Sequence, residues 1–381
     1  MNYILAGMSF VLQHVLKVLA VGTFHNRRVV FFSYFGKQYS CNPKYLCEYL
    51  MQASPEYEIV WAFAKPEDFA WLEQRGMHIV RYNSLAFARA CLTSGFVVTN
   101  SQLPAWFPVL RRMHIINTWH GGGAYKRVGT GFLRASKGKQ LMDALSRHKP
   151  CVYLSSSKAF TQLTIRQSFE HEGEVLECGM PRNDLLVRQS TPEVTQRVKE
   201  RLGIDPDTRI LLYAPTYRED REISSDYFDL NIARDALARR FGGTWTIVFR
   251  LHYLVAGKLP ATQDYVDAST YPDMQELLYA ADVLLTDYSS SIWDFGLTGR
   301  PCFLYVPDLD EFDLQRGFYS DIRTWPWPLA QTKDELARNV LEFDEQAFAR
   351  KLEQHYEDLG STDTGHACEA VANWMAAVEQ R

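Results

Sequence analysis

The sequence lacks the cysteine patterns that hold metals or build disulfide scaffolds. Its 7 cysteines include no C-x-x-C pair and no zinc-ligand spacing. Several stand inside apolar runs, so we expect buried free thiols in a reducing compartment. Internal repeats and low-complexity segments are absent, which excludes a repeat protein. No helix-turn-helix, zinc-finger or RNP-type motif is present, so no nucleic-acid partner is expected.

What remains is the composition of a soluble globular protein. Of 381 residues, 46% are hydrophobic and 23% are charged. A chain of this length exceeds one compact core, so we expect two domains. Residues 1–150 hold 18 Lys and Arg against 7 Asp and Glu, whereas the remainder holds 23 against 38. This uneven charge indicates different partners for the two halves, with an anionic surface, nucleic acid or an acidic membrane, for the first; the alternative is chance variation in surface charge.

The first 25 residues are nearly uncharged and indicate a surface helix. Ser9, Gln13 and Lys17 recur every four residues and would form one narrow polar face. A signal peptide would need a basic start and a small-residue cleavage site, and neither is clear. We expect an interfacial helix that lies in a membrane surface. The alternative is a helix packed on the core of the first domain.

A basic stretch between Tyr125 and Lys149 supports the membrane interpretation. It holds 7 lysines and arginines against Asp143 alone, with apolar residues between them. This pattern is typical of a basic amphipathic segment at an anionic bilayer. A nucleic-acid patch is the alternative, and it lacks a supporting motif.

Short apolar runs alternate with helical patterns along the rest of the chain. This alternation predicts an α/β protein with two doubly wound, Rossmann-like domains, residues 26–190 and 191–381, and allows the last helix to pack back on the first domain. The expected strands are residues 28–33, 58–63, 78–80, 96–99, 115–118, 152–155 and 175–178, then 209–214, 245–251, 283–286 and 302–305. Expected helices include residues 43–51, 66–75, 158–169, 192–202 and 274–281. Ligands of such sheets bind beyond the carboxyl ends of the strands.

Three serines follow one of these strands. Ser289, Ser290 and Ser291 come after the strand at residues 283–286 and the turn at Asp287, and helical spacing begins after them. Free N–H groups at the start of a helix, together with hydroxyls, suit a phosphate or diphosphate. The alternative is that one serine caps the helix. We expect an anion site, because a cap requires one hydroxyl and three are present.

A histidine stands at the end of another strand. Residues 115–118 lead into His120 and three glycines, Gly121, Gly122 and Gly123. Glycines allow a sharp bend and a close approach to a ligand, and imidazole accepts a proton near neutral pH. His120 is therefore a candidate general base; the alternative is a histidine tied into a glycine turn. The HGGG run also resembles the oxyanion loop of lipases and esterases, but the chain lacks the G-x-S-x-G elbow of that class.

Basic side chains stand at or just beyond the ends of two expected strands of the second domain. Arg218 follows the first of these strands, and Arg250 and His252 follow the second. They could neutralise the charge that builds on a phosphoryl group. For any one arginine the alternative is a surface ion pair. Near the expected domain boundary, residues 179–184 either cap the following segment or line a cleft.

Six motifs occur in an order that resembles one known family. They are WHGGGAYKRVG, GMPRND, APTYRE, RLH, DMQELLYAADVLLTDYSSSIWDF and PDLDEFDLQRGFY. Together they cover roughly residues 115–320 and resemble the CDP-glycerol glycerophosphotransferase family of teichoic acid and capsule polymer synthesis. Members look like GT-B enzymes, with two Rossmann-like domains and the active site in the cleft between them.

The resemblance implies an activity and partners. The implied reaction moves glycerol phosphate, or another polyol phosphate, from a CDP-alcohol to a hydroxyl of a lipid-linked acceptor of the undecaprenyl-diphosphate type and releases CMP. It implies a peripheral, monotopic enzyme at the cytoplasmic face of the membrane, with the acceptor on the first domain and the donor on the second. CDP-glycerol is then a substrate, no cofactor, metal or nucleic acid is expected, and an oligomer is compatible with the resemblance.

The motifs also imply residue roles. His120 would deprotonate the attacking hydroxyl, and Arg250 and His252 would stabilise developing charge. Asp287 is expected to shape its turn rather than to bind a metal. The implied donor residues are Thr216, Arg218, Asp287, Ser289, Ser290, Ser291 and Arg316. The implied acceptor or loop residues are Gly121, Gly122, Gly123, Arg182 and Asp184.

Two positions depart from the family pattern. The usual His-Gly-Thr is His120-Gly121-Gly122 here, which loses a hydroxyl, and Tyr253 replaces the proline of Arg-x-His-Pro, which changes loop stiffness. Neither change removes a charged or proton-transferring group. Two other functions stay open: a glycosyltransferase of the same fold that uses a nucleotide sugar, and a membrane-associated protein that binds nucleotide without turnover.

Overall fold

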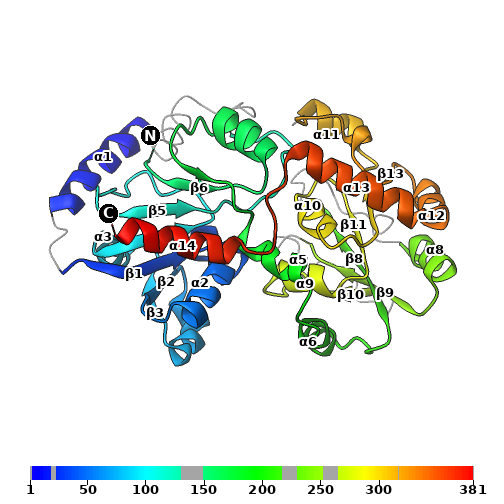
Figure 1. Ribbon diagram of the computed structural model, residues 1–381, viewed down its shortest axis with the longest axis horizontal. Helices are drawn as coiled ribbons and strands as arrows, with labels where there is room; N and C mark the ends of the chain where they lie inside the picture. Colours follow the sequence, from blue (N-terminus) through cyan, green and yellow to red (C-terminus); the bar gives the residue numbers. More distant parts are fainter. Residues whose placement is uncertain are drawn as a thin grey trace. The chain divides into compact units, whose positions relative to one another are not determined.

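The chain forms two compact units. The computed structural model describes residues 2–18, 23–129, 149–216, 230–251, 265–315 and 317–380 (Figure 1). The first unit comprises Met1–His120, Val128–Asp184 and Thr362–Arg381, and the second comprises Gly121–Arg127 and Leu185–Ser361. The expected break after residue 190 falls at residue 184 in this division. The chain also changes unit after His120, after Arg127 and after Ser361.

The first unit is built on a parallel sheet with the strand order β3-β2-β1-β4-β5-β6-β7. The strands are β1 (His25–Phe32), β2 (Glu58–Phe63), β3 (His78–Arg81), β4 (Ser94–Thr99), β5 (His114–Asn117), β6 (Val152–Leu154) and β7 (Val175–Leu176). The helices are α1 (Asn2–Val18), α2 (Cys41–Ala53), α3 (Leu85–Leu92) and α14 (Ala367–Glu379), the 3-10 helices η1 (Tyr34–Gly36), η2 (Pro66–Arg75) and η5 (Pro181–Asn183), and the π-helix η4 (Phe160–Ser168).

Both faces of this sheet are covered. Neighbouring residues of each strand point to opposite sides, and the side chains on each side pack into a separate buried cluster. Phe31 and Trp61 pack into one cluster with α2 and with Met375 of α14, while Phe32 and Val60 pack into a second cluster with α3. In Figure 1, α14 lies beside α2, and contacts between the two helices confirm this position. The last helix of the chain therefore completes the core of the first unit.

The second unit repeats the topology of the first. Its parallel sheet has the order β10-β9-β8-β11-β12-β13. The strands are β8 (Arg209–Ala214), β9 (Trp245–Phe249), β10 (Tyr265–Asp267), β11 (Val283–Thr286), β12 (Cys302–Tyr305) and β13 (Leu329–Ala330). The helices are α5 (Asp184–Arg188), α6 (Glu193–Leu202), α8 (Asn231–Phe241), α9 (Met274–Ala280), α10 (Ser291–Gly296), α11 (Leu309–Gln315), η6 (Ile322–Thr324), α12 (Lys333–Leu341) and α13 (Glu345–Leu359).

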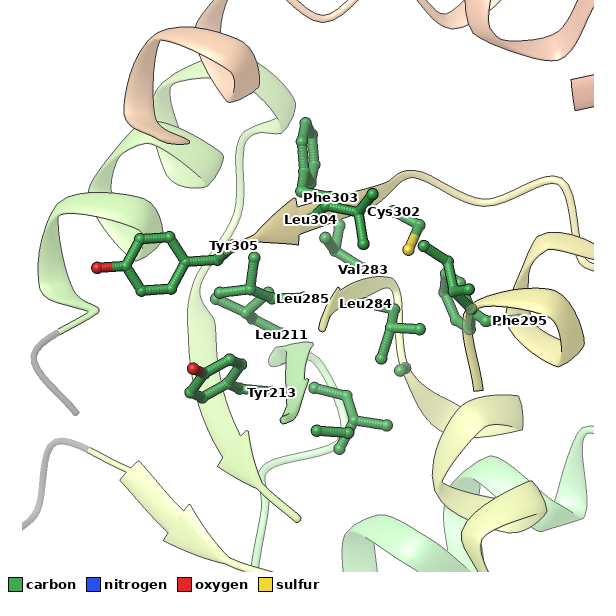
Figure 2. Close-up of a cluster of buried hydrophobic side chains, with 14 of the residues drawn as sticks. Leu211, Tyr213, Val283, Leu284, Leu285, Phe295, Cys302, Phe303, Leu304 and Tyr305 are labelled. Atoms are coloured by element: carbon green, nitrogen blue, oxygen red, sulfur yellow. The ribbon is translucent and has the colours of Figure 1, made fainter. Parts of the chain in front are cut away.

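The central strands of the second unit carry continuous apolar runs. Figure 2 shows side chains of β8, β11 and β12 packed together with Phe295 of α10. Leu212, Leu284 and Leu304 are fully buried. Such runs are typical of strands covered on both faces. The predicted α/β class with two doubly wound sheets is confirmed.

Helix α1 has both a packed side and an exposed side. Leu16 is buried in the first unit, and the Gln13 side chain donates a hydrogen bond to the carbonyl of Ala105. Val11, Leu12 and Val15 are 61%, 42% and 46% exposed. Within the described ranges, no helix combines the length and apolar character needed to cross a bilayer. Most of the predicted basic segment, residues 130–148, lies outside the described residues.

Candidate active site

Each sheet has one point where successive connections run in opposite directions. This point lies between β1 and β4 in the first unit and between β8 and β11 in the second. Open α/β sheets bind ligands beyond the carboxyl ends of the strands at such a point. In the first unit, Asn100 follows β4 and its side chain hydrogen-bonds to the loop after β1. In the second unit, Asp287 follows β11 and its side chain hydrogen-bonds to the loop after β8.

His120 lies just beyond the carboxyl end of β5 in the first unit. Its Nδ1 is 2.9 Å from the backbone oxygen of Asn100, which directly follows β4. Its ring is half-buried and stacks on Trp119, with 4.3 Å between ring centroids, and Tyr34 lies at 5.6 Å. Arg182 donates to the His120 carbonyl oxygen at 2.6 Å. Because a carbonyl oxygen can only accept, Nδ1 carries the hydrogen, and Nε2 is left as the basic atom of the neutral ring.

Three asparagines that the sequence analysis did not single out organise this loop. Asn42 donates to the carbonyl oxygens of Thr118 and Trp119, at 3.2 and 3.1 Å. Asn117 accepts from the Trp119 N–H, at 3.0 Å. Asn100 is fully buried and accepts from the Tyr34 N–H, at 2.8 Å. The available signal was that Asn100 and Asn117 stand where apolar strands end.

The glycines after His120 belong to the second unit. An added Cβ on Gly122 would lie closer than 3.0 Å to the indole of Trp293, and one on Gly123 would lie 2.9 Å from the same ring. Gly123 also has a φ of +66°. In this chain, the close approach that requires Gly122 is made to Trp293, whereas an added Cβ on Gly123 would lie nearest to the Tyr125 ring, at 2.5 Å. A side chain at position 122, such as the usual family threonine, would require the Trp293 ring to shift.

Tyr125 anchors the same segment in the second unit. It is buried against Trp325, with ring centroids 4.4 Å apart, and its hydroxyl lies 3.0 Å from Nε2 of His355. Burial lowers the pKa of His355 to about 4, so its ring is neutral at pH 7 and accepts from the Tyr125 hydroxyl. The Arg127 N–H donates to the Gly317 carbonyl oxygen at 3.1 Å. Residues 121–127 are therefore fixed by packing and hydrogen bonds.

Asp287 joins the two central strand ends of the second unit. Its fully buried carboxylate accepts from the Thr216 N–H at 2.8 and 3.0 Å and from the Thr216 hydroxyl at 2.7 Å. Thr216 follows β8 and Asp287 follows β11. These hydrogen bonds join the ends of β8 and β11 and bring two residues of the predicted donor set together.

The serines stand at the start of α10, at the same edge of the sheet. Ser289 and Ser290 are half-buried and Ser291 is buried. The Ser291 hydroxyl donates to that of Ser289 at 2.9 Å. Ser290 is the residue before the helix, and its side chain makes no capping hydrogen bond. The Ser290 hydroxyl is therefore not used to cap α10, and this helix, with 6 residues, contributes only a small dipole.

The remaining predicted residues are placed as follows. Arg250 is half-buried and donates from Nη1 to the carbonyls of Ala268, at 3.1 Å, and Ser269. Asp184 accepts from the N–H groups of Ala367 and Cys368, at 2.9 Å each, and so caps α14. Arg218, His252 and Arg316 lie outside the described residues.

The predicted free thiols are confirmed. All 7 cysteines are free thiols, and those at positions 41, 47, 91, 302 and 368 are buried. In the described part of the chain, no group of three or more His, Cys, Asp or Glu side chains is arranged to hold a metal ion.

Two doubly wound units with polar groups at their strand ends are typical of nucleotide-binding enzymes. The family model for CDP-glycerol:poly(glycerophosphate) glycerophosphotransferases matches residues 15–376. The chain belongs to this family of phosphotransferases, and the resemblance of the six motifs is confirmed.

Two similar bacterial proteins differ from each other in length. The teichoic acid poly(glycerol phosphate) polymerase of Bacillus subtilis (strain 168) is 30% identical over 367 residues, which are 93% of this chain and 49% of that protein. The teichoic acid glycerol-phosphate transferase of Staphylococcus aureus (strain NCTC 8325 / PS 47) is 29% identical over 361 residues, 91% of this chain and 92% of that protein. The chain thus spans about half of the first relative and most of the second.

Solved structures agree on the fold. Structures of the wall teichoic acid polymerase TagF, including a variant soaked with CDPG, align with a TM-score of 0.84 at 26% identity and cover 100% of this chain and 97% of theirs. A UDP-N-acetylglucosamine 2-epimerase from Listeria monocytogenes aligns with a TM-score of 0.53 at 11% identity, over 95% of this chain and 98% of its own. The second likeness concerns the fold alone.

Proposed function

We propose that this chain transfers glycerol phosphate, or another polyol phosphate, from a CDP-alcohol such as CDP-glycerol to a hydroxyl of a membrane lipid-linked acceptor. The observation that carries the proposal is the Nδ1 contact of His120 with a backbone carbonyl, which leaves Nε2 as a base. Family membership supports the donor class, as does the similarity to a polymerase that was soaked with CDPG.

The proposed reaction is one displacement at phosphorus. Nε2 of His120 takes the proton of the acceptor hydroxyl as the oxygen attacks the β-phosphorus of the donor. A bond from the acceptor oxygen to this phosphorus forms, the bond to the bridging oxygen breaks, and CMP leaves with the electron pair. The products are the acceptor extended by one polyol phosphate and CMP.

The donor would occupy the strand-end edge of the second unit. Asp287 and Thr216 hold β8 and β11 together there, and the Ser290 hydroxyl offers a hydrogen bond to the diphosphate. Arg250 and His252 would supply positive charge against the phosphates, as the family motifs imply, with Arg218 and Arg316 as further donor contacts. The mechanism uses no cofactor, because these groups can stabilise the developing charge.

The direct test measures CMP release by the purified protein. We expect CMP to appear with CDP-glycerol and a lipid-linked acceptor analogue, and mass spectrometry should show the acceptor heavier by glycerol phosphate. UDP-sugars serve as the matched donors. Release of UDP with transfer of a sugar, or binding of CDP-glycerol without turnover, would contradict the proposal and favour one of the two other functions.

We also propose that the enzyme acts at the cytoplasmic face of the membrane as a peripheral protein. The exposed Val11, Leu12 and Val15 support this location, because apolar side chains on one side of a helix can enter the headgroup region. The excess of Lys and Arg in residues 1–150 would add attraction to anionic lipids.

Vesicle binding tests this location. The protein should co-sediment with vesicles that contain phosphatidylglycerol, and Leu12→Glu should weaken binding by about tenfold or more, since a buried charge replaces an apolar contact. The matched control is Leu85→Glu, because Leu85 is 80% exposed on α3 and lies outside the helix proposed to bind. Equal binding of both variants and the parent would exclude α1 as the contact.

A further inference from the structure

The loop after β1 holds an unusual backbone conformation beside His120. Tyr34 and Phe35 have φ values of +46° and +59°, a region that bulky residues seldom adopt. Gly36 continues the turn at +79°, where an added Cβ would lie 2.8 Å from Cβ of Tyr82. Such a conformation persists only when neighbouring groups hold it.

Asn100 supplies hydrogen bonds to this loop from the next strand of the sheet. Its Oδ1 accepts from the Tyr34 N–H at 2.8 Å and from the Ser101 hydroxyl at 3.0 Å. Its Nδ2 donates to the Ser33 hydroxyl at 3.0 Å. The side chain of Asn100 is fully buried, so these hydrogen bonds are shielded from water and fix the position of the whole residue.

The backbone oxygen of the same residue accepts from Nδ1 of His120. One residue therefore holds the strained Tyr34 turn with its side chain and orients the imidazole with its carbonyl. The second unit has a matching arrangement, because Asp287 directly follows β11 and accepts from the N–H of Thr216, two residues beyond β8. Asn100 likewise directly follows β4, and Tyr34 lies two residues beyond β1.

The difference between the two positions is chemical. The carboxylate of Asp287 only accepts, whereas the amide of Asn100 also donates, to Ser33. A carboxylate at position 100 would place a negative charge beside the imidazole and favour its protonated form, which cannot act as a base. A neutral amide avoids this charge and keeps the loop closed.

We infer that Asn100 is the positioning residue of His120: its side chain locks the carbonyl that keeps the hydrogen on Nδ1 and leaves Nε2 for the acceptor hydroxyl. This inference rests on the proposed role of His120 as general base. The residue acts through His120 and the Tyr34 turn, with no contact to substrate required. Hydrogen-bond partners that orient metal-ligating histidines typically cost about 10–100-fold in affinity or activity when they are removed, and we expect an effect of similar size here.

The test compares two variants with a matched control. Asn100→Ala should lower kcat for CMP release by about 10–100-fold and leave the KM for CDP-glycerol near that of the parent. Nitrogen-15 NMR of labelled histidine should show the His120 signal, identified by its loss in His120→Gln, shifting away from the Nδ1–H tautomer. Asn100→Asp keeps an acceptor for Tyr34 and should move the acidic limb of the pH profile to higher pH.

Ser155→Ala is the control, because Ser155 is also fully buried beyond a strand end, that of β6, and accepts from the Thr161 hydroxyl at 2.9 Å. It should leave kcat and the His120 tautomer unchanged. The inference is overturned if Asn100→Ala matches this control in kcat and in the NMR spectrum. Where the alanine variant does not fold, it is overturned if Asn100→Asp leaves the acidic limb of the pH profile where the control has it. A parent protein that releases no CMP would instead overturn the proposed function, since the tautomer measurement needs no substrate.

Discussion

His120→Ala is expected to lower kcat for CMP release by about 10²–10⁴-fold, the range that a positioned general base contributes. Binding of CDP-glycerol should stay near that of the parent protein, because the imidazole acts on the acceptor hydroxyl. Single-turnover kinetics with labelled donor, together with calorimetric binding of CDP-glycerol, measure the two quantities separately.

His114→Ala is the matched control for this experiment. His114 begins β5 and His120 follows its end, so the two histidines flank one strand. Burial lowers the pKa of His114, and its ring stacks on Phe96 with 5.4 Å between centroids. Loss of that packing should lower stability and leave turnover per folded molecule unchanged. Equal turnover of the His120 variant and the control would remove His120 from the mechanism.

Gly122→Ala is expected to destabilise the second unit by about 1–3 kcal/mol, the usual cost of an extra methyl group in a packed site. The added Cβ meets the indole of Trp293, which is fully buried and cannot swing into solvent. Gly122→Thr should cost more, since two further atoms must be accommodated. Urea unfolding followed by tryptophan fluorescence measures the change.

Gly7→Ala is the control, because an added Cβ there meets nothing within 4 Å and alanine favours a helix. The double variant Gly122→Ala with Trp293→Leu tests the cause. If the clash is with the indole, the two effects should be clearly non-additive, since the smaller side chain makes room for the methyl group. Parent-like unfolding of Gly122→Ala would show that this segment tolerates side chains, and the departure from His-Gly-Thr would need another reason.

The strands that sequence predicts best are those buried on both faces. Residues 58–63, 209–214, 283–286 and 302–305 are predicted with the bounds that β2, β8, β11 and β12 have. Continuous apolar runs mark such strands clearly. The short strands β10 and β13 were not predicted, because Tyr265–Asp267 and Leu329–Ala330 carry too few residues for a pattern.

The residues of the candidate site likewise include some that the sequence predicts and some that it does not. His120 and Asp287 are recognisable because each follows an apolar run in a motif. Asn100 could not be recognised from the sequence, because its contacts with the loop after β1 require β4 to lie beside β1. Local sequence does not determine the order of strands in a sheet. The glycines illustrate a third case. The sequence shows that residue 122 is a glycine, but not that it must be small, because the neighbour that requires this, Trp293, stands far along the chain.

The packing of α14 on α2 has a consequence for biosynthesis. Val371 and Met375 are fully buried members of a cluster that includes Phe31 and Trp61, more than 300 positions earlier in the sequence. Synthesis must therefore reach Met375 before that cluster can close, whereas the second unit needs nothing beyond Ser361. The half of the molecule that is translated first is thus the one that matures last, and until then its aromatic strands have to be kept from associating with other chains.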